Sequence, residues 1–231
     1  RPHRLTYDRL CKNDDILTDV LVDHVLYWTT VRKACKSYHP LDLTHNDVIS
    51  ILSDNVILQR DFPRAMSQIL ELPGLRQYSE SLRSPNEVKD FLHHMRKYLD
   101  IYLPDCPFEI SSTYRYSASN PENSSLKPEA SIVARKHIKC GEEIKYLCGI
   151  SVPLHKEELA LLSKDGRDFS IVESSRKKTV SLMLAPARFV NHTCDPNARL
   201  DLKGSAGAMI TAIKNIEPGH EITVFYADDY F

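Results

Sequence analysis

The segment Arg188–Asn197 concentrates side chains of several chemical kinds within ten residues. It reads Arg-Phe-Val-Asn-His-Thr-Cys-Asp-Pro-Asn, so an amide, an imidazole and a thiol lie close to a turn that proline restrains. Asn191 and His192 are adjacent and would point to opposite faces of a strand, whereas on a loop they would offer backbone and amide groups to a ligand. His192 and Cys194 would make half of a zinc site, but no second Cys/His pair follows at zinc-finger spacing. The residues alone leave open a ligand-binding loop, a metal site and a turn without function.

The bulk composition excludes several classes of protein. The chain has 231 residues, a net charge of −1 and only seven glycines, and it contains neither G-x-G-x-x-G nor G-x-x-x-x-G-K-[ST]. We therefore expect neither a Rossmann cofactor site nor a P-loop. No apolar run approaches the roughly 18 residues that span a bilayer, and the first residues lack the apolar stretch of a signal peptide. The six scattered cysteines are interpreted as reduced thiols.

The first hundred or so residues predict helices. Ser84 can cap a helix, Pro85 fits its first turn and Glu87 occupies the position of a capping-box carboxylate. Thr44 and Asp47 offer a second cap of the same kind. Apolar residues then recur at three- and four-residue spacing, at Val88, Phe91, Leu92, Met95, Tyr98, Leu99 and Tyr102. We interpret this stripe as the core face of a helix in a bundle.

The pattern of residue types changes after Pro104, where short apolar runs alternate with turn-rich stretches. These runs are 132–134, 144–148, 169–172, 180–184, 209–213 and 222–226. Because helices do not alternate regularly with them, the pattern favours curved antiparallel sheets over a parallel α/β sheet. One short helix is expected among the strands, from His155 to Leu162.

Three motifs, in this order along the chain, resemble those of SET-domain protein lysine methyltransferases. Ile138–Ile144 resembles the opening element of that family, Arg188–Asn197 resembles R-F-[IV]-N-H-x-C-x-P-N, and Ile216–Tyr226 resembles G-E-E-[IL]-T-x-x-Y. The resemblance implies a β-rich SET fold in which the C-terminal segment threads through a loop to form a pseudoknot. Such threaded connections are exceptions to the usual topology rules.

These observations together predict the fold class and the domain boundaries. We expect an α+β protein with an N-terminal helical domain at 1–105 and a SET catalytic domain at 106–231. A short insert is expected at about 150–168.

Further segments resemble the suppressor-of-variegation 4-20 type, whose members methylate lysine 20 of histone H4. They are Leu10–Asp15, Thr113–Ser117, Asp168–Ile171 and Ser175–Lys177. The resemblance implies a nuclear, chromosomal histone-lysine N-methyltransferase that uses S-adenosylmethionine and leaves S-adenosylhomocysteine. Its partner would be the histone H4 tail in the nucleosome, with indirect DNA contact and no membrane. A SET enzyme with a non-histone substrate and a catalytically silent SET-fold binding module remain alternatives.

The resemblance also implies roles for single residues. Tyr226 matches the active-site tyrosine, whose hydroxyl orients the lysine amine, although a tyrosine at a strand end also suits ordinary packing. Ser170 matches a small polar residue beside the lysine channel and would bias how many methyl groups fit. The residues that match cofactor-binding positions are Tyr116, Ser117, Ala118, Ser119, Ala130, His137, Arg176, Asn191 and His192. Tyr27, or else Trp28, would cover the adenine.

The remaining expectations concern metal and charge. Cys194 matches a zinc ligand that the family completes with three cysteines in a tail after the SET domain, and this chain stops at Phe231 before any such tail. We therefore expect no zinc bound by this chain alone, since one cysteine cannot build a tetrahedral site. The acidic residues Asp228, Asp229, Glu217 and Glu221 would face the basic histone tail, and 176–178 would face nucleosomal DNA, unless both clusters are merely solvated surface.

Overall fold

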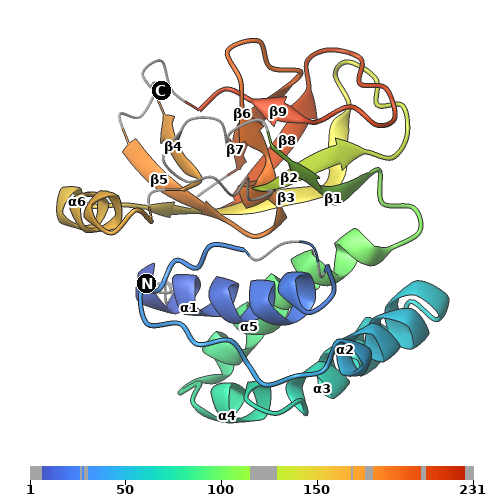
Figure 1. The fold of residues 1–231 in the computed structure, drawn as a ribbon, viewed down its shortest axis with the longest axis vertical. Helices are drawn as coiled ribbons and strands as arrows, with labels where there is room; N and C mark the ends of the chain where they lie inside the picture. The colour runs from blue at the N-terminus through green and yellow to red at the C-terminus, as the bar shows by residue number, and fades with distance from the viewer. Residues whose placement is uncertain are drawn as a thin grey trace. The chain divides into compact units, whose positions relative to one another are not determined.

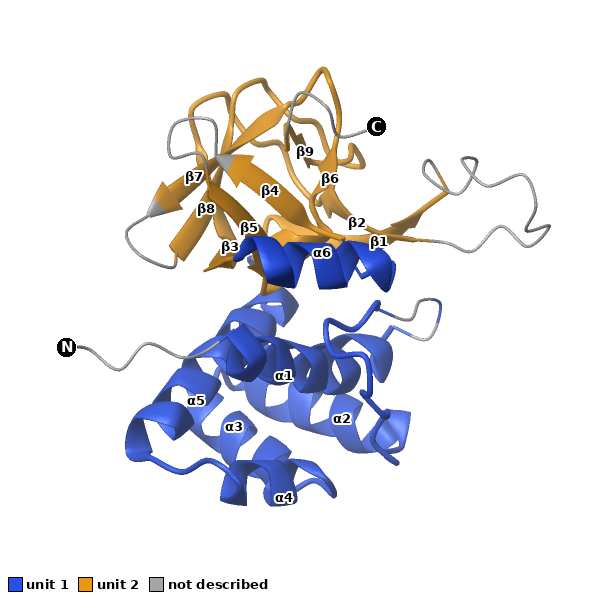
Figure 2. Cartoon of the chain, turned by 90° about the vertical axis from the view of Figure 1, so that its left-hand side faces the viewer, with its two compact units in different colours: residues 1–105, 154–168 blue, residues 106–153, 169–231 orange. Residues whose placement is uncertain are grey.

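The computed structural model divides the chain into two compact units (Figures 1 and 2). Unit 1 comprises residues 1–105 and 154–168, and unit 2 comprises 106–153 and 169–231. The residues that the structure describes are 7–26, 28, 31–114, 129–167, 169–174, 179–203 and 207–226.

Unit 1 is helical throughout its regular structure. Its elements are α1 (Tyr7–Thr18), the π-helical η1 (Asp19–Asp23), α2 (His45–Ile51), the π-helical η2 (Leu52–Leu58), α3 (Phe62–Leu70), α4 (Leu75–Glu80), α5 (Pro85–Leu99), the 3-10 helix η3 (Asp100–Tyr102) and α6 (Lys156–Lys164). Although α6 falls between two strands in the sequence, Figure 2 colours it with the other helices. Lys36 forms an ion pair with Asp165 at 3.1 Å, and Arg167 donates to the carbonyl of Ala34, so the end of the α6 segment is tied to residues 34–36.

The predicted stripe on α5 is confirmed at its centre, where Phe91, Met95, Tyr98 and Leu99 are fully buried. The Ser84 hydroxyl accepts from the N–H of Glu87 at 3.2 Å, as expected for a cap. The carboxylate of Glu87 departs from the expected capping box, because it accepts from the N–H of Arg83.

The expected cap of α2 forms in full. The hydroxyl of Thr44 accepts from the N–H of Asp47, and the carboxylate of Asp47 accepts from the N–H of Thr44 at 3.2 Å. Here both polar groups that the capping box requires are used.

Three aspartates along α1 and η1 hold a segment that has neither helix nor strand. Asp15, Asp19 and Asp23 recur every four residues and therefore share one face of the helix. Each of the three carboxylates accepts from groups between positions 31 and 41: Ala34 and Cys35 donate to Asp15, Tyr38 and Leu41 to Asp19, and Val31 and Lys33 to Asp23. The acidic face of the helix thus replaces the regular backbone pairing that this segment lacks.

At Asp15, hydrogen bonds from the backbone oppose the effect of burial on the carboxyl group. Its two oxygens accept from the backbone N–H groups of Ala34 at 2.6 Å and Cys35 at 2.7 Å. Burial raises the pKa of Asp15, and the two N–H groups oppose that rise. A buried carboxyl is therefore retained here because both of its oxygens are hydrogen-bonded.

A neighbouring carboxylate joins α1 to α5. One oxygen of Asp14 accepts from Nε2 of His94 at 2.9 Å and from the hydroxyl of Tyr98 at 2.7 Å. All three residues are buried, so this polar contact lies inside the core of unit 1.

Unit 2 contains the β-structure. Its strands are β1 (Phe108–Thr113), β2 (Glu129–Ala134), β3 (Glu143–Pro153), β4 (Ile171–Ser174), β5 (Thr179–Leu184), β6 (Asn191–His192), β7 (Ala198–Lys203), β8 (Gly207–Ala212) and β9 (Thr223–Val224). β1 pairs with β2, and the larger sheet has the order β4-β5-β3-β8-β7 with antiparallel neighbours. The mixture of helices and curled β-sheet agrees with the expected α+β composition.

One pairing differs from the antiparallel pattern. β6 and β9 run parallel, with Asn191 opposite Thr223 and His192 opposite Val224 (Figure 1). Before it reaches β6, the last described segment bonds to β2, where the N–H of Ile222 donates to the carbonyl of Ile132 at 2.8 Å. The segment thus contacts β2 and β6 in turn, and parallel pairing requires such a long connection.

Prediction for the helical unit. Asp15→Asn removes one of two acceptor oxygens and places an NH2 group against a backbone N–H, so one buried donor loses its partner. We expect the free energy of unfolding to fall by about 1–3 kcal/mol, as measured by chemical denaturation. The matched control is Asp8→Asn on the exposed side of α1, which should change stability little. Equal stability of the two variants would contradict the role assigned to Asp15.

Candidate active site

Two hydroxyl groups from distant parts of unit 2 meet at one short turn. The 3-10 helix η5 (Pro186–Phe189) follows β5 and leads into β6. The Ser170 hydroxyl donates to the carbonyl of Arg188 at 2.7 Å, and the Tyr226 hydroxyl donates to the carbonyl of Val190. Both side chains are buried, at 8% and 7% exposure. Ser170 and Tyr226, the two residues expected to be catalytic, therefore donate to backbone carbonyls that lie two residues apart in the sequence.

The backbone at the Ser170 end of this arrangement is unusual. Ser170 has φ 54° and Ala185, just before η5, has φ 64°. Residues other than glycine rarely adopt positive φ, and such conformations often occur at functional sites. The carbonyl of Ser170 accepts from the N–H of Met183 at 2.9 Å, which ties the residue to β5.

His192 positions the backbone of Tyr226. Its Nδ1 accepts from the N–H of Tyr226 at 2.9 Å, so Nδ1 carries no proton. The imidazole contacts the rings of Phe225 and Tyr226, with centroid distances of 5.2 and 5.7 Å. Only 3% of His192 is exposed, so its side chain serves as an internal acceptor rather than as a group open to solvent.

Asn191 links three parts of unit 2. Its amide Nδ2 donates to the carbonyl of Ala130 on β2 at 3.2 Å and to Oε1 of Glu221 at 2.9 Å. Two of the expected cofactor-binding positions, Asn191 and Ala130, therefore contact each other directly. Glu221, expected on an acidic rim, pairs with this amide at the base of β9.

Asn197 has a role that sequence reasoning did not assign. Its side-chain oxygen accepts from the N–H of Thr223 at 2.9 Å, and its amide donates to the carbonyl of Glu221 at 2.8 Å. Its own carbonyl accepts from the N–H of Ile213 at 2.8 Å. As the last residue of the ten-residue motif, Asn197 carried a signal that could have identified it.

Arg188, the first residue of the motif, also has a structural role that the sequence did not predict. Only 5% of it is exposed, and its guanidinium lies 4.7 Å from the ring centre of Phe169 and 5.6 Å from that of Phe189. Such contacts over ring faces favour a cation in a dry environment. The motif is therefore anchored at both ends by residues that stabilise the turn.

Other expected site residues lie elsewhere. His137 is at the surface, where Nδ1 lies 3.0 Å from Oε1 of Glu217 in an exposed pair. Cys194 is exposed, with its sulfur 4.0 Å from Nε2 of His192. The expected residues that lie outside the described part of the chain are Tyr27, Tyr116, Ser117, Ala118, Ser119, 176–178, Asp228 and Asp229.

The described residues contain neither a metal-binding cluster nor a membrane-spanning helix. Across the described ranges, His, Cys, Asp and Glu side chains form no group of three or more that could hold a metal ion. No helix within those same ranges has both the length and the apolar character required to cross a bilayer.

Part of the chain matches a known family model. Residues 154–227 match the family model described as SET domain. This part of the chain is therefore similar to SET domains. The match contains η5, β6 and β9, and thus the turn at which Ser170 and Tyr226 meet.

Similarity to named relatives extends beyond the matched SET domain. The chain is 46% identical over 229 residues to "Histone-lysine N-methyltransferase SET9" of Phaeosphaeria nodorum, covering 98% of this chain and 34% of that protein. It is 44% identical over 232 residues to the set9 protein of Neurospora crassa, covering 100% of this chain and 29% of that protein. The chain therefore spans about a third of the length of these relatives.

A solved structure gives a weaker likeness to the SET domain. The Neurospora protein described as the SET domain protein DIM-5, a histone lysine methyltransferase, superposes with a TM-score of 0.38 at 17% identity. The superposition covers 55% of this chain and 54% of that one.

Prediction for the segment before β9. Asn197→Ala removes two hydrogen bonds that hold the segment before β9, so we expect unfolding free energy to fall by about 1–3 kcal/mol. The change should appear as a lower Tm in calorimetry. Asn46→Ala, an exposed position on α2, is the control and should leave Tm nearly unchanged. A Tm for Asn197→Ala equal to that of the control would contradict the anchoring role.

Proposed function

We propose that this chain is a histone-lysine N-methyltransferase that transfers methyl groups from S-adenosylmethionine to lysine 20 of histone H4 in chromatin. The observation that carries the proposal is the meeting of the Tyr226 and Ser170 hydroxyls at the carbonyls of Val190 and Arg188. The names of the relatives support the reaction class, and the resemblance to the suppressor-of-variegation 4-20 type supports the substrate. Such an activity belongs in the nucleus, on the chromosome.

The chemistry of this turn fits a methyl donor and an amine. Both hydroxyls donate their protons to carbonyls, so the oxygens of Tyr226 and Ser170 would take part in any contact with substrate as acceptors. Oxygen acceptors attract a positively charged sulfonium methyl group and the N–H groups of an amine. When bound, S-adenosylmethionine supplies that electrophilic methyl group.

The proposed role of Tyr226 is to orient the lysine amine. A free lysine has a pKa near 10.4, so its amine must lose a proton before it can attack. A narrow, buried channel lowers the pKa of an amine because the charged form loses hydration. The buried Tyr226 oxygen would then accept from the neutral amine and hold it in line for transfer, and such positioning supplies a large part of the rate.

The proposed role of Ser170 is to influence the product state. Its hydroxyl is held at the carbonyl of Arg188, and its oxygen would hold a water or a partly methylated amine. The number of methyl groups that fit would follow from the space this leaves.

The other proposed assignments follow from the resemblance. Asn191, His192 and Ala130 would hold the cofactor mainly through backbone groups, since the side chains of Asn191 and His192 already have internal partners. We retain Tyr116–Ser119, Arg176, His137 and Tyr27 as proposed cofactor contacts. The domain division at 105/106 and the pseudoknot also remain proposals, and the parallel β6–β9 pair supports the latter.

Prediction for the catalytic tyrosine. Tyr226→Phe removes the oxygen that orients the amine, so we expect kcat to fall by about 100-fold or more while cofactor affinity is retained. Methyl transfer is measured with radiolabelled S-adenosylmethionine and cofactor binding by calorimetry. Tyr102→Phe is a matched control, because its hydroxyl also donates to a buried carbonyl, that of Leu21 in unit 1. Near-normal turnover of Tyr226→Phe would refute the assignment.

Prediction for the substrate. The chain is incubated with radiolabelled cofactor and recombinant nucleosomes that carry either lysine or arginine at position 20 of histone H4. We expect label on H4 in the first sample and its loss in the second. Label that persists on the substituted nucleosomes would favour a different lysine or a non-histone substrate, and absence of label on both, with intact cofactor binding, would favour a binding module.

A further inference from the structure

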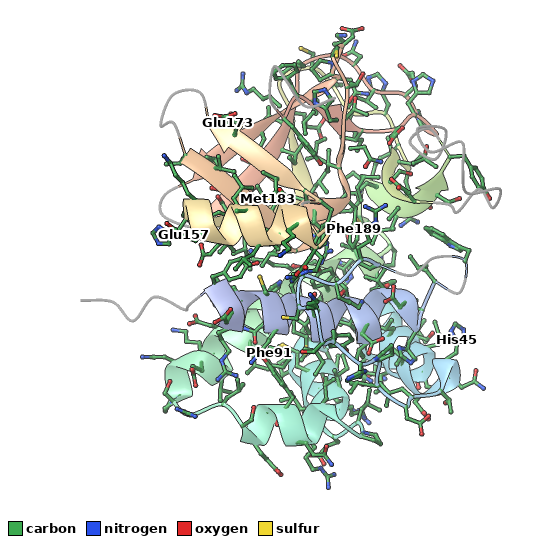
Figure 3. The ribbon with its side chains drawn as sticks, turned by 60° about the vertical axis from the view of Figure 1, so that its left-hand side comes forward. His45, Phe91, Glu157, Glu173, Met183 and Phe189 are labelled. Carbon is green, nitrogen blue, oxygen red and sulfur yellow. The ribbon has the colours of Figure 1, made fainter. Side chains whose placement is uncertain are left out.

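Unit 2 contains a pocket that the proposed catalytic groups do not use. Its volume is about 300 Å³, and it is lined by residues of β3, β4, β5 and β7 together with the segments around Pro196, Ile213 and Phe225. A volume of this size lies at the lower end of the range for ligand sites. Figure 3 labels two of the lining residues, Glu173 on β4 and Met183 on β5.

Exposed apolar side chains converge on this pocket. Leu202 and Ile213 are each 38% exposed and Phe225 is 42% exposed, and all three line the pocket. Val172 and Leu200 extend the apolar wall. Single exposed apolar residues need no explanation, but a group of them around one concavity marks a site of contact with another molecule.

The charges at the pocket favour a basic occupant. Glu173 is exposed and lines the wall, as does Arg199. The guanidinium of Arg199 is held by Asp201, with Nε 3.1 and 3.2 Å from its two oxygens. The cation of Arg199 is therefore compensated, and these three side chains sum to one negative charge. A partner that places an apolar group in the pocket and a positive charge at its rim would be complementary.

The pocket adjoins the proposed catalytic residue. Phe225 lines the pocket, whereas the next side chain, that of Tyr226, reaches the carbonyl of Val190. The N–H of Glu173 donates to the carbonyl of Tyr226 at 3.4 Å. Consecutive Cα atoms lie 3.8 Å apart, so a peptide that presents a lysine to Tyr226 has neighbouring residues within reach of the pocket.

We propose that this pocket binds a bulky aliphatic side chain of the peptide substrate, close in sequence to the target lysine, while Glu173 pairs with an adjacent basic residue. The inference rests on the proposed function, since it names the part of the substrate that the site reads. Recognition by an apolar pocket and a rim carboxylate gives selectivity for aliphatic residues flanked by basic ones.

The first test changes the pocket. The double variant Leu202→Ser/Ile213→Ser replaces two half-exposed rim residues and should fold normally. Binding of a fluorescein-labelled H4 peptide containing lysine 20 is measured by anisotropy, and turnover is measured separately. We expect peptide Kd and KM to rise about tenfold, with kcat and the KM for S-adenosylmethionine unchanged. Leu58→Ser, at a side chain in unit 1 that is 76% exposed, is the matched control and should bind as wild type.

The second test changes the peptide. Each aliphatic residue near lysine 20 is replaced by alanine in turn, and each peptide is measured against both proteins. We expect one alanine substitution in the peptide to weaken binding to the wild-type protein. The same substitution should not weaken binding to the double variant, because the pocket of that variant is already lost. Glu173→Gln should weaken binding by a few-fold, and more at low ionic strength than at high.

The outcomes separate this inference from the proposed function. Unchanged peptide Kd in the double variant, additive effects at every peptide position, or no binding to wild type would each overturn the pocket's role. A change in sedimentation of the double variant with unchanged peptide binding would assign the pocket to a second copy of the chain and also overturn it. Peptide binding that depends on the pocket without any methyl transfer would uphold the pocket and overturn the enzyme assignment.

Discussion

The arrangement of the candidate site depends on the parallel contact between β6 and β9. That contact brings residues 223–226 beside the motif Arg188–Asn197, and it is held from both ends by asparagine amides. Without it the hydroxyl of Tyr226 would not reach the carbonyl of Val190. The Asn197 side chain both donates and accepts a hydrogen bond, and the Asn191 amide donates to two oxygens. A network of satisfied hydrogen bonds of this kind rigidifies the segment that contains it. The same segment therefore provides both the position and the stiffness that an oriented tyrosine requires.

In both units, polar side chains form hydrogen bonds with backbone groups of distant segments. In unit 1, carboxylates of α1 and η1 accept backbone N–H groups from residues 31–41. In unit 2, the Asn197 side chain accepts from the N–H of Thr223 at the start of β9 and donates to the carbonyl of Glu221 before it. In both cases a side chain replaces the pairing that an irregular backbone cannot find in a helix or sheet. The buried Asp15 and the partly buried Asn197 are tolerated because their polar atoms are paired, so loss of either side chain removes the partner of a backbone donor.

Two consecutive side chains near the C-terminal end of unit 2 belong to two different proposed sites. Tyr226 points to the turn with Ser170, and Phe225 lines the apolar pocket with Leu202 and Ile213. The proposed chemistry and the proposed substrate selection would therefore depend on consecutive residues, and the rings of both contact His192. Under the proposed function, changes in the pocket would alter the preferred peptide and leave the proposed methyl-transfer groups in place.

Local patterns in the sequence determined the elements that depend on neighbouring residues. The stripe from Phe91 to Leu99, the caps at Ser84 and Thr44, and the short helix α6 follow from spacing and capping alone. The ten-residue motif also contains the carbonyls to which the Ser170 and Tyr226 hydroxyls donate. Tertiary structure alone decided the partners of Asn191, which lie 61 residues before it and 30 residues after it. It also placed His137 at the surface beside Glu217, 80 residues away. Spacing along the chain reports which side chains share a helix or strand face, whereas hydrogen bonds between distant segments depend on the path that the whole chain takes, and that path brought Tyr226 to Arg188–Asn197.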